Sequence, residues 1–334
     1  MKVLVTGGSG FVGRTLCAAT VQRDWTTVSL SRSPSPHGTW EMADISLPLS
    51  THFRPDVVVH AAARSSPWGS RREFERQNIQ GTRNVVDFCE RAGRPHLVYI
   101  STSAVLYRNE HQFGMTETMA PPERFLNEYA RTKFAGERLV QGYAGPQTIL
   151  RPRAVFGPGD TVVFPRLLRA AARGKFPRIE SGQTVMADLI FIDTLVDYIL
   201  RVIERKRTGL YHVTNNQPVP LVAFLSDVFA RLGLPPPSRQ ISVDRALRAA
   251  SCIEAFYRLL PFLGEPPITR FGVSVFAYSK TMDVTKALRD LDPPSVSLEE
   301  GVERFVASFR NAVSSKLVSV PTKARRSGLG GATG

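Results

Sequence analysis

The sequence predicts an α/β fold with two parts: a doubly wound parallel sheet and a smaller, mainly helical lobe towards the C-terminus. Three observations lead to this prediction. Short apolar runs alternate with helical patterns in the first half of the chain, a glycine-rich turn joins the first run to the first helical pattern, and proline clusters replace the alternation after about residue 151. A chain of 334 residues that is 43% hydrophobic is also long enough for about two domains with a buried core.

Each expected strand is a short run rich in β-branched residues. These runs lie at 2–6, 26–30, 56–60, 96–101, 147–150, 189–192 and 210–213. Helical patterns at 11–23 and 73–91 separate the early runs. Apolar strands that alternate with helices are typical of a parallel sheet that helices cover on both faces.

The predicted domain boundaries follow the change of pattern. Residues 1–150, together with about 188–215, are expected to form the sheet domain. Residues 151–187 and 216–315 are expected to form the substrate-binding lobe. Residues 316–334 carry glycine, serine and basic residues without periodicity, which predicts a disordered tail.

Composition excludes several classes of protein. The net charge is +14, but no basic stretch alternates with aromatic residues, which favours a solvated basic surface over a nucleic-acid-binding face. The three cysteines form no CxxC pair, so neither a disulfide framework nor a metal site is predicted. The chain starts directly with a strand and has no apolar run of about 18 residues, which predicts a cytoplasmic protein without a signal peptide or membrane span.

The glycine-rich segment at residues 6–13 reads TGGSGFVG and lies between the first strand and the first helix. Glycines allow a tight turn, close approach of a pyrophosphate to the backbone, and close packing of the helix on the strand. The helix N-terminus offers free N–H groups to the phosphates. An ordinary glycine-rich turn is the alternative, but the position between strand and helix favours a Rossmann-type dinucleotide site.

The end of the second strand indicates which cofactor binds. NAD-binding folds usually place a carboxylate there for the adenosine ribose, whereas this chain has Ser31 and Arg32. A guanidinium can pair with a 2′-phosphate through two hydrogen bonds. The sequence therefore favours NADPH over NADH, with a solvated loop cation as the alternative role of Arg32.

Tyr129 and Lys133 are four residues apart in a helical pattern, so they project from the same face. A nearby lysine cation, helped by an oxidised nicotinamide, is expected to lower the pKa of the tyrosine and to make it useful for proton transfer. Residues 101–103 (STS) follow the strand at 96–101, at the sheet edge where such folds bind ligands. A hydroxyl there can hydrogen-bond a substrate carbonyl oxygen.

Several motifs together resemble the extended short-chain dehydrogenase/reductases over nearly the whole chain up to about residue 310. They are TGGSGFVG, HAAA at 60–63, Asn78 with GTRNV at 81–85, STSAV at 101–105, YARTK at 129–133 and LRPRAVFGPGD at 150–160. The resemblance implies that Ser103 positions the substrate, Tyr129 is the acid and base, and Lys133 binds the nicotinamide ribose. It also assigns Asn78 to the proton relay, with holding the helix onto the sheet as the alternative.

The same resemblance implies a set of cofactor-binding residues along the sheet edge. These are Gly7, Gly10, Phe11, Val12, Gly13, Arg32, Asp44, Ile45, Ala61, Ala62, Ala63, Tyr129, Lys133, Pro152 and Val155.

Three features indicate the branch of the family. Thr102-Ser103-Ala104 replaces the Thr-Asp-Glu of sugar-nucleotide dehydratases, Ala154 replaces an asparagine common in epimerases, and residues 246–263 form an apolar helical segment that suggests a hydrophobic substrate. Further segments resemble the 3β-hydroxysteroid dehydrogenase branch, close to its bacterial 2-alkyl-3-oxoalkanoate reductases. This implies reversible oxidoreduction of a ketone and a secondary alcohol. A sugar-nucleotide epimerase and a non-catalytic, cofactor-sensing protein of the same fold are the alternatives.

The expected substrate contacts are Trp68, Ser103 and Arg153. Trp68 is either at the substrate entrance or a loop anchor. Arg153 either binds an anionic group of the substrate or cofactor, or forms a structural salt bridge. The helix at 246–263 either covers the substrate or, with its arginines, contacts a membrane surface. A homodimer is expected from the family resemblance alone.

Overall fold

The computed structural model describes residues 1–174, 176–237 and 239–318. Its centre is a parallel sheet of seven strands in the order β12-β7-β5-β4-β1-β2-β3. These strands are β1 (Lys2–Thr6), β2 (Thr26–Ser31), β3 (Thr39–Met42), β4 (Val57–His60), β5 (His96–Ile100), β7 (Gln147–Pro152) and β12 (Gly209–Val213). The strand order reverses between β1 and β4, as in a doubly wound sheet. The predicted fold class is therefore confirmed.

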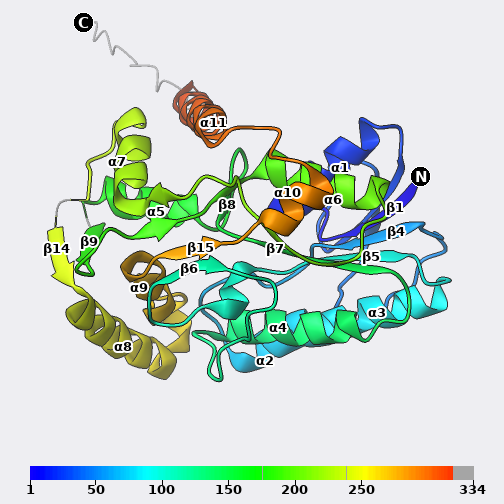
Figure 1. Ribbon diagram of the computed structural model, residues 1–334, viewed down its shortest axis with the longest axis horizontal. Coiled ribbons are helices and arrows are strands. Elements are labelled where there is room, and N and C mark those ends of the chain that lie inside the picture. The colour runs from blue at the N-terminus through cyan, green and yellow to red at the C-terminus, as the bar shows by residue number, and fades with distance from the viewer. Residues whose placement is uncertain (175, 238, 319–334) are drawn as a thin grey trace, which may run out of the picture.

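Helices cover both faces of this sheet (Figure 1). On one face lie α1 (Phe11–Val21) and α6 (Ile192–Glu204), and on the other lie α3 (Gly81–Arg91) and α4 (Glu128–Gln141). Successive strand residues point to opposite faces. Val3 and Val5 accordingly pack in one buried cluster and Leu4 in the other. The helical pattern before Arg91 is divided into α2 (Arg71–Phe74), a π-helical turn η1 (Glu75–Gln80) and α3.

The second half adds most of the lobe. Its helices are α5 (Phe164–Ala172), α7 (Leu221–Arg231), α8 (Val243–Leu259) and α9 (Arg270–Ala277), and α10 (Thr285–Leu291) and α11 (Leu298–Val318) follow. Short strands, which the sequence did not predict, join them. A four-stranded sheet contains β13 (Val219–Pro220), β10 (Met186–Ala187), β15 (Lys280–Met282) and β6 (Gln112–Met115), and a pair contains β14 (Arg239–Ser242) and β9 (Pro177–Glu180). The lobe is nevertheless mainly helical, as predicted.

Two predictions about individual segments were wrong. The run at 189–192 does not enter the main sheet, because α6 already begins at Ile192 and leaves only β11 (Ile190–Phe191), which pairs with β8 (Val155–Phe156). The tail was expected from residue 316, but α11 continues to Val318, since no proline or glycine interrupts it before Pro321. The rest of the predicted tail lies outside the described residues. The domain boundaries stay a prediction.

Among the residues that the structure describes, every helix is too short or too polar to cross a bilayer.

Candidate active site

The predicted cofactor and catalytic residues follow the carboxyl ends of strands in the main sheet. Residues 7–13 follow β1, 61–63 follow β4, 101–103 follow β5, and Pro152 ends β7. Asp44 and Ile45 come shortly after β3, and Val155 begins β8. Because the strands are parallel, their carboxyl ends share one edge of the sheet. Ligands of doubly wound sheets bind at this edge.

The glycine-rich turn has the geometry that a pyrophosphate needs. Gly7 has a φ of 75°, and a Cβ there would lie 2.8 Å from the backbone of Ala62. A Cβ on Gly13 would lie 2.2 Å from the Gly7 carbonyl oxygen. Gly10 is the N-cap of α1 and makes no side-chain cap, so no capping side chain occupies the N–H groups of the first turn, from Phe11 and Val12 onwards. These residues fit a dinucleotide cofactor.

Positive charge gathers around the adenosine side of the predicted site. Arg32 is exposed directly after β2. Burial by itself would raise the pKa of Asp44, but hydrogen bonds from Ser46 and the charges of Arg32 and Arg76 hold this pKa below its ordinary value. Asp44 is therefore ionised at neutral pH and lies close to both arginines.

Ser103 begins a 3₁₀ turn, η2 (Ser103–Leu106), directly after β5 and is 2% exposed. Its hydroxyl lies 2.8 Å from the phenol oxygen of Tyr107, a residue that we did not predict. The available signal was the four-residue spacing across a helical turn, which brings two side chains together. The hydroxyl of Ser103 is thus held by a buried phenol.

Helix α4 carries Tyr129 and Lys133, and its start is set by Asn127. The side-chain oxygen of Asn127 accepts a hydrogen bond from the Ala130 N–H at 2.8 Å, as an N-cap does. Lys133 Nζ donates to the carbonyl of Ile100, the last residue of β5, at 2.7 Å. The helix therefore brings Tyr129 and Lys133 to the strand end that also carries Ser103.

Burial governs the pKa values of Tyr129 and Lys133, and the expected lowering of the Tyr129 pKa by Lys133 together with an oxidised nicotinamide stays a prediction. Burial raises the pKa of Tyr129 to about 12, although the Thr102 hydroxyl acts to lower it. Burial also lowers the pKa of Lys133 to about 7, against the opposing charge of Glu137. Loss of water thus disfavours the charged form of each residue. At neutral pH Tyr129 is a neutral phenol, which is the form that donates a proton.

A buried ion pair, which we did not predict, joins helix α4 to strand β7. Glu137 lies one turn beyond Lys133 and is paired with Arg151 of β7. Arg151 Nε donates to Glu137 Oε1 at 2.8 Å, and Nη2 donates to Oε2 at 2.6 Å. The Ser101 hydroxyl donates to the same carboxylate. The spacing of Tyr129, Lys133 and Glu137 by four residues was the signal for this third member of the face.

Asn78 lies in the π-helical turn η1 and is buried. Its side-chain oxygen accepts from the Arg64 N–H at 2.8 Å, and its amide donates to the Thr132 hydroxyl at 3.0 Å. These contacts join the loop after β4 to helix α4, as in the anchoring alternative for this residue. A role in the proton relay stays a prediction.

Arg153 follows β7 and is 3% exposed. Its Nη1 donates to the Asp188 carbonyl, and its guanidinium carbon lies 5.9 Å from the centre of the Tyr107 ring. None of the ion pairs formed within the described residues includes Arg153, so the structural salt bridge that was one alternative for it is not found. The structure instead places Arg153 beside the phenol that holds Ser103.

Helix α8 of the lobe contacts the loop after β4 at Trp68. The Trp68 ring, in the loop after β4, lies 5.6 Å from the guanidinium carbon of Arg258 on α8. Ala246 and Ala250, in the first half of α8, pack in a cluster with Val273 and Ala277 of α9. Trp68 therefore lies where the lobe meets the predicted substrate entrance.

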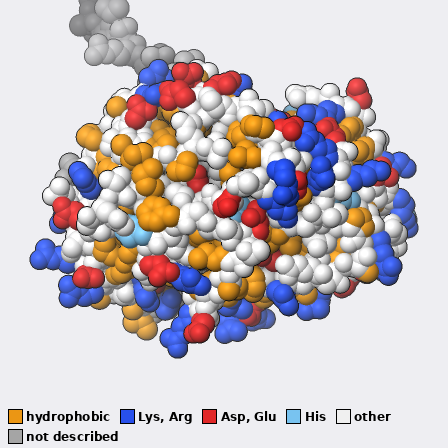
Figure 2. Space-filling model, in the orientation of Figure 1, with side chains coloured by type: hydrophobic (Ala, Val, Ile, Leu, Met, Phe, Trp, Pro, Cys, Tyr) orange, Lys and Arg blue, Asp and Glu red, His pale blue; other side chains and the backbone are white. Residues whose placement is uncertain are grey.

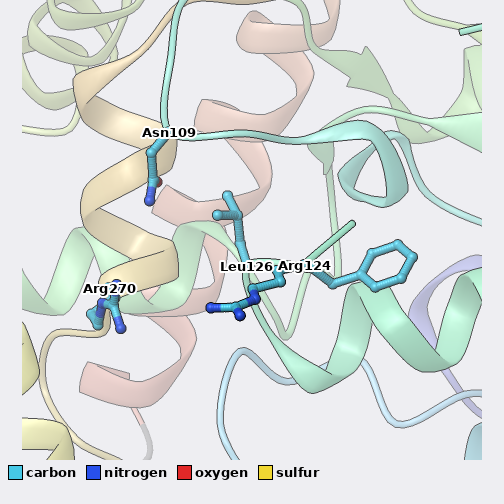
Figure 3. A pocket seen from close by; sticks show the side chains of 5 residues that line it. Asn109, Arg124, Leu126 and Arg270 are labelled. Atoms are coloured by element: carbon cyan, nitrogen blue, oxygen red, sulfur yellow. The ribbon is translucent and has the colours of Figure 1, made fainter. Parts of the chain in front are cut away.

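A cavity of about 310 Å³ opens just before α4 (Figure 3). It is lined by Asn109, Arg124, Phe125, Leu126 and Arg270. Phe271, next to Arg270, stacks on Tyr107 with ring centres 6.5 Å apart. The cavity thus lies close to Tyr107, the residue that contacts Ser103, and two arginines line it.

Comparisons with known proteins agree with this geometry. Residues 3–215 match the model of the NAD dependent epimerase/dehydratase family. A 2-alkyl-3-oxoalkanoate reductase of Stenotrophomonas maltophilia is 33% identical over 92% of this chain and 99% of its own. A 3beta-hydroxysteroid-dehydrogenase/decarboxylase (isoform 2) of Arabidopsis thaliana is 31% identical over 81% of this chain and 52% of its own.

Among solved structures, MoeE5 in complex with UDP-glucose and NAD has the same fold, with a TM-score of 0.72 and 24% identity over 94% of this chain and 100% of its own. The predicted class of enzyme, an oxidoreductase acting on CH–OH and C=O groups with a nicotinamide cofactor, agrees with these relatives. The chain belongs to the NAD dependent epimerase/dehydratase family, the extended short-chain dehydrogenase/reductases that its motifs resemble.

Proposed function

We propose that this protein is an NADPH-dependent reductase that interconverts a ketone and a secondary alcohol on a hydrophobic substrate. The observation that carries the proposal is the convergence of Ser103, Tyr129 and Lys133 at the end of β5. The relatives that are named reductases and 3beta-hydroxysteroid dehydrogenases support a ketone or alcohol as substrate.

The three residues have distinct tasks in this reaction. NADPH, when bound, supplies the hydride that reduces the carbonyl carbon. Tyr129 donates its phenolic proton to the carbonyl oxygen, and its pKa of about 12 keeps that proton available at neutral pH. Ser103 hydrogen-bonds the same oxygen and is oriented by Tyr107. Lys133 is the residue that would hold the nicotinamide ribose.

Reduction uses the neutral phenol of Tyr129 as proton donor, whereas alcohol oxidation uses the phenolate as base, and burial disfavours the phenolate.

The preference for NADPH rests on Arg32 and on the lack of a carboxylate at the end of β2. Replacing Arg32 by Ala should raise the KM for NADPH by roughly tenfold or more, because an exposed guanidinium pairing with a phosphate contributes about 1–2 kcal/mol. The KM for NADH should change little. Steady-state kinetics with both cofactors measure this, and Arg23→Ala, at an exposed pair with Glu204, is the control. A clear preference of the unaltered protein for NADH would contradict the assignment.

The test of the function is oxidation of NADPH in the presence of 3-oxo acids, steroid ketones and polyketide-like ketones. Turnover with at least one of them is expected. Retention of NAD⁺ through purification with turnover of a UDP-sugar would instead support an epimerase. Lack of turnover together with tight binding of another protein would support a cofactor sensor.

We also propose that the end of α8 and the 3₁₀ turn after it (Pro261–Leu263) contact an anionic membrane surface. Phe256 is 52% exposed, Leu259 79% and Phe262 80%, and hydrophobic and basic side chains lie side by side along this edge in Figure 2. Apolar groups flanked by arginines favour the interface of anionic lipids. We expect the protein to pellet with phosphatidylglycerol vesicles and Leu259→Ser/Phe262→Ser to pellet several-fold less. Equal pelleting of both would contradict this contact. The homodimer and the cytoplasmic location stay predictions.

A further inference from the structure

We propose that Arg14, in the first turn of α1, binds the pyrophosphate of the nicotinamide cofactor and joins it to the 157–160 loop. This loop lies between β8 and α5, where the chain enters the lobe. The role depends on the nicotinamide cofactor that the family uses, and not on the substrate or on the choice between NADPH and NADH. Three observations lead to it: the position of Arg14 on α1, the contact of its guanidinium with Gly159, and the lack of an acidic partner among the described residues.

Arg14 lies one helical turn beyond Gly10, the residue at which the glycine-rich turn enters α1. The Arg14 N–H donates to the Gly10 carbonyl at 2.8 Å. Residues four apart share a face of a helix, and helical side chains lean towards the N-terminus. The Arg14 side chain is thus directed along α1 towards the turn that is expected to bind the pyrophosphate.

The guanidinium of Arg14 occupies the space over Gly159. A Cβ on Gly159 would lie 2.1 Å from Arg14 Nη2, and the φ of Gly159 is 83°. Both the backbone conformation and the arginine therefore disfavour a side chain at this position. Arg14 is only partly buried, so a ligand from solvent can reach it.

The loop that carries Gly159 is held on both sides. The Asp160 carboxylate accepts from the N–H groups of residues 162–164 at 2.7–3.2 Å, which fixes the loop to the start of α5. A Cβ on Gly157 would lie 2.4 Å from Ile192 Cγ2, so the backbone also packs closely on the start of α6. Arg14 therefore contacts a loop whose position is fixed by other parts of the chain.

Within the described part of the chain, no acid pairs with Arg14. None of the ion pairs found there includes it, whereas Arg23, just past the end of the same helix, lies 3.4 Å from Glu204. Asp160, the acid next to Gly159, has both of its carboxylate oxygens occupied by backbone N–H groups. The charge of Arg14 is thus available to an anion. A pyrophosphate carries negative charge that the neutral N–H groups of the turn stabilise but do not cancel.

Arg14 and Arg32 would recognise different parts of the cofactor. Arg32 follows β2 and is assigned to the 2′-phosphate, which only NADPH carries. The pyrophosphate is common to NADPH and NADH. Loss of Arg14 should therefore weaken the binding of both cofactors, whereas loss of Arg32 should weaken that of NADPH alone.

The test measures the Kd values of NADPH and NADH for Arg14→Met by quenching of protein fluorescence. We expect both Kd values to rise by the same factor, roughly tenfold, the scale of one charge-assisted hydrogen bond to a phosphate. Arg14→Lys keeps the charge and should recover part of the affinity. Arg23→Met, which breaks an exposed pair, is the control and should leave both Kd values unchanged. Unchanged Kd values in Arg14→Met, or a loss confined to NADPH, would overturn the proposal.

A double-variant cycle separates this role from a purely structural contact between Arg14 and the loop. Gly159→Ala places a methyl group where the guanidinium lies, so it should weaken the binding of both cofactors when Arg14 is present. In the Arg14→Met background it should weaken them no further. If Gly159→Ala weakens binding equally in both backgrounds, Arg14 does not act through this contact and the proposal fails. These measurements need no substrate, so a failure of the proposed reductase activity would leave their outcome intact.

Discussion

Replacing Tyr129 by Phe is expected to lower kcat roughly a thousandfold, within the range that general acids contribute. The variant removes a single oxygen atom, so packing of α4 against the sheet should persist. Without the Tyr129 phenol, Ser103 still holds the carbonyl oxygen, but the direct proton donor is lost, and Tyr107 contacts this group only through the Ser103 hydroxyl. Cofactor binding should be largely kept, because the glycine-rich turn and Arg32 are untouched. Steady-state reduction kinetics and quenching of protein fluorescence by NADPH measure the two effects separately.

Tyr143→Phe is the matched control for this variant. The Tyr143 hydroxyl is also buried and donates to the Pro95 carbonyl at 2.7 Å, beyond the far end of the same helix. Its loss should cost about 1 kcal/mol of stability and leave kcat unaltered. If Tyr129→Phe kept most of its kcat, or if both variants lost kcat alike, Tyr129 would not be the proton donor.

Replacing Arg151 by Met should lower the free energy of unfolding by about 3–5 kcal/mol, since it leaves the Glu137 carboxylate buried and unpaired. Arg151 is 4% exposed and supplies both hydrogen bonds of the pair. Glu137 lies on the face of α4 that carries Tyr129 and Lys133. Urea denaturation followed by circular dichroism measures the loss.

Two controls test whether burial causes this effect. Arg205→Met breaks the exposed pair with Asp292 and should cost at most about 1 kcal/mol. The double variant Arg151→Met/Glu137→Met should recover much of the loss, because it removes the stranded charge. A loss in Arg151→Met no larger than in Arg205→Met would show that the buried pair does not support the helix.

Much of the fold and the site was predictable because it depends on local sequence. The strands of the main sheet follow from apolar runs, the glycine-rich turn follows from its place between strand and helix, and Tyr129 and Lys133 share a face because of helical spacing. β3 was missed, since its short TWEM sequence is exposed at the sheet edge and carries no apolar run. The run at 189–192 was expected in the main sheet, but α6 begins at Ile192, and the short strand β11 that remains pairs with β8.

By itself, the sequence determined which residues lie at the carboxyl ends of the sheet strands. It also determined the family to which the chain belongs. Only the tertiary structure decided their charge states and partners. Whether a tyrosine is phenol or phenolate, and whether an arginine is paired or open, depends on burial and on groups far apart in the chain, such as Glu137 with Arg151 or Tyr107 with Arg153. Desolvation and hydrogen bonding act through space, and spacing along the chain does not record them.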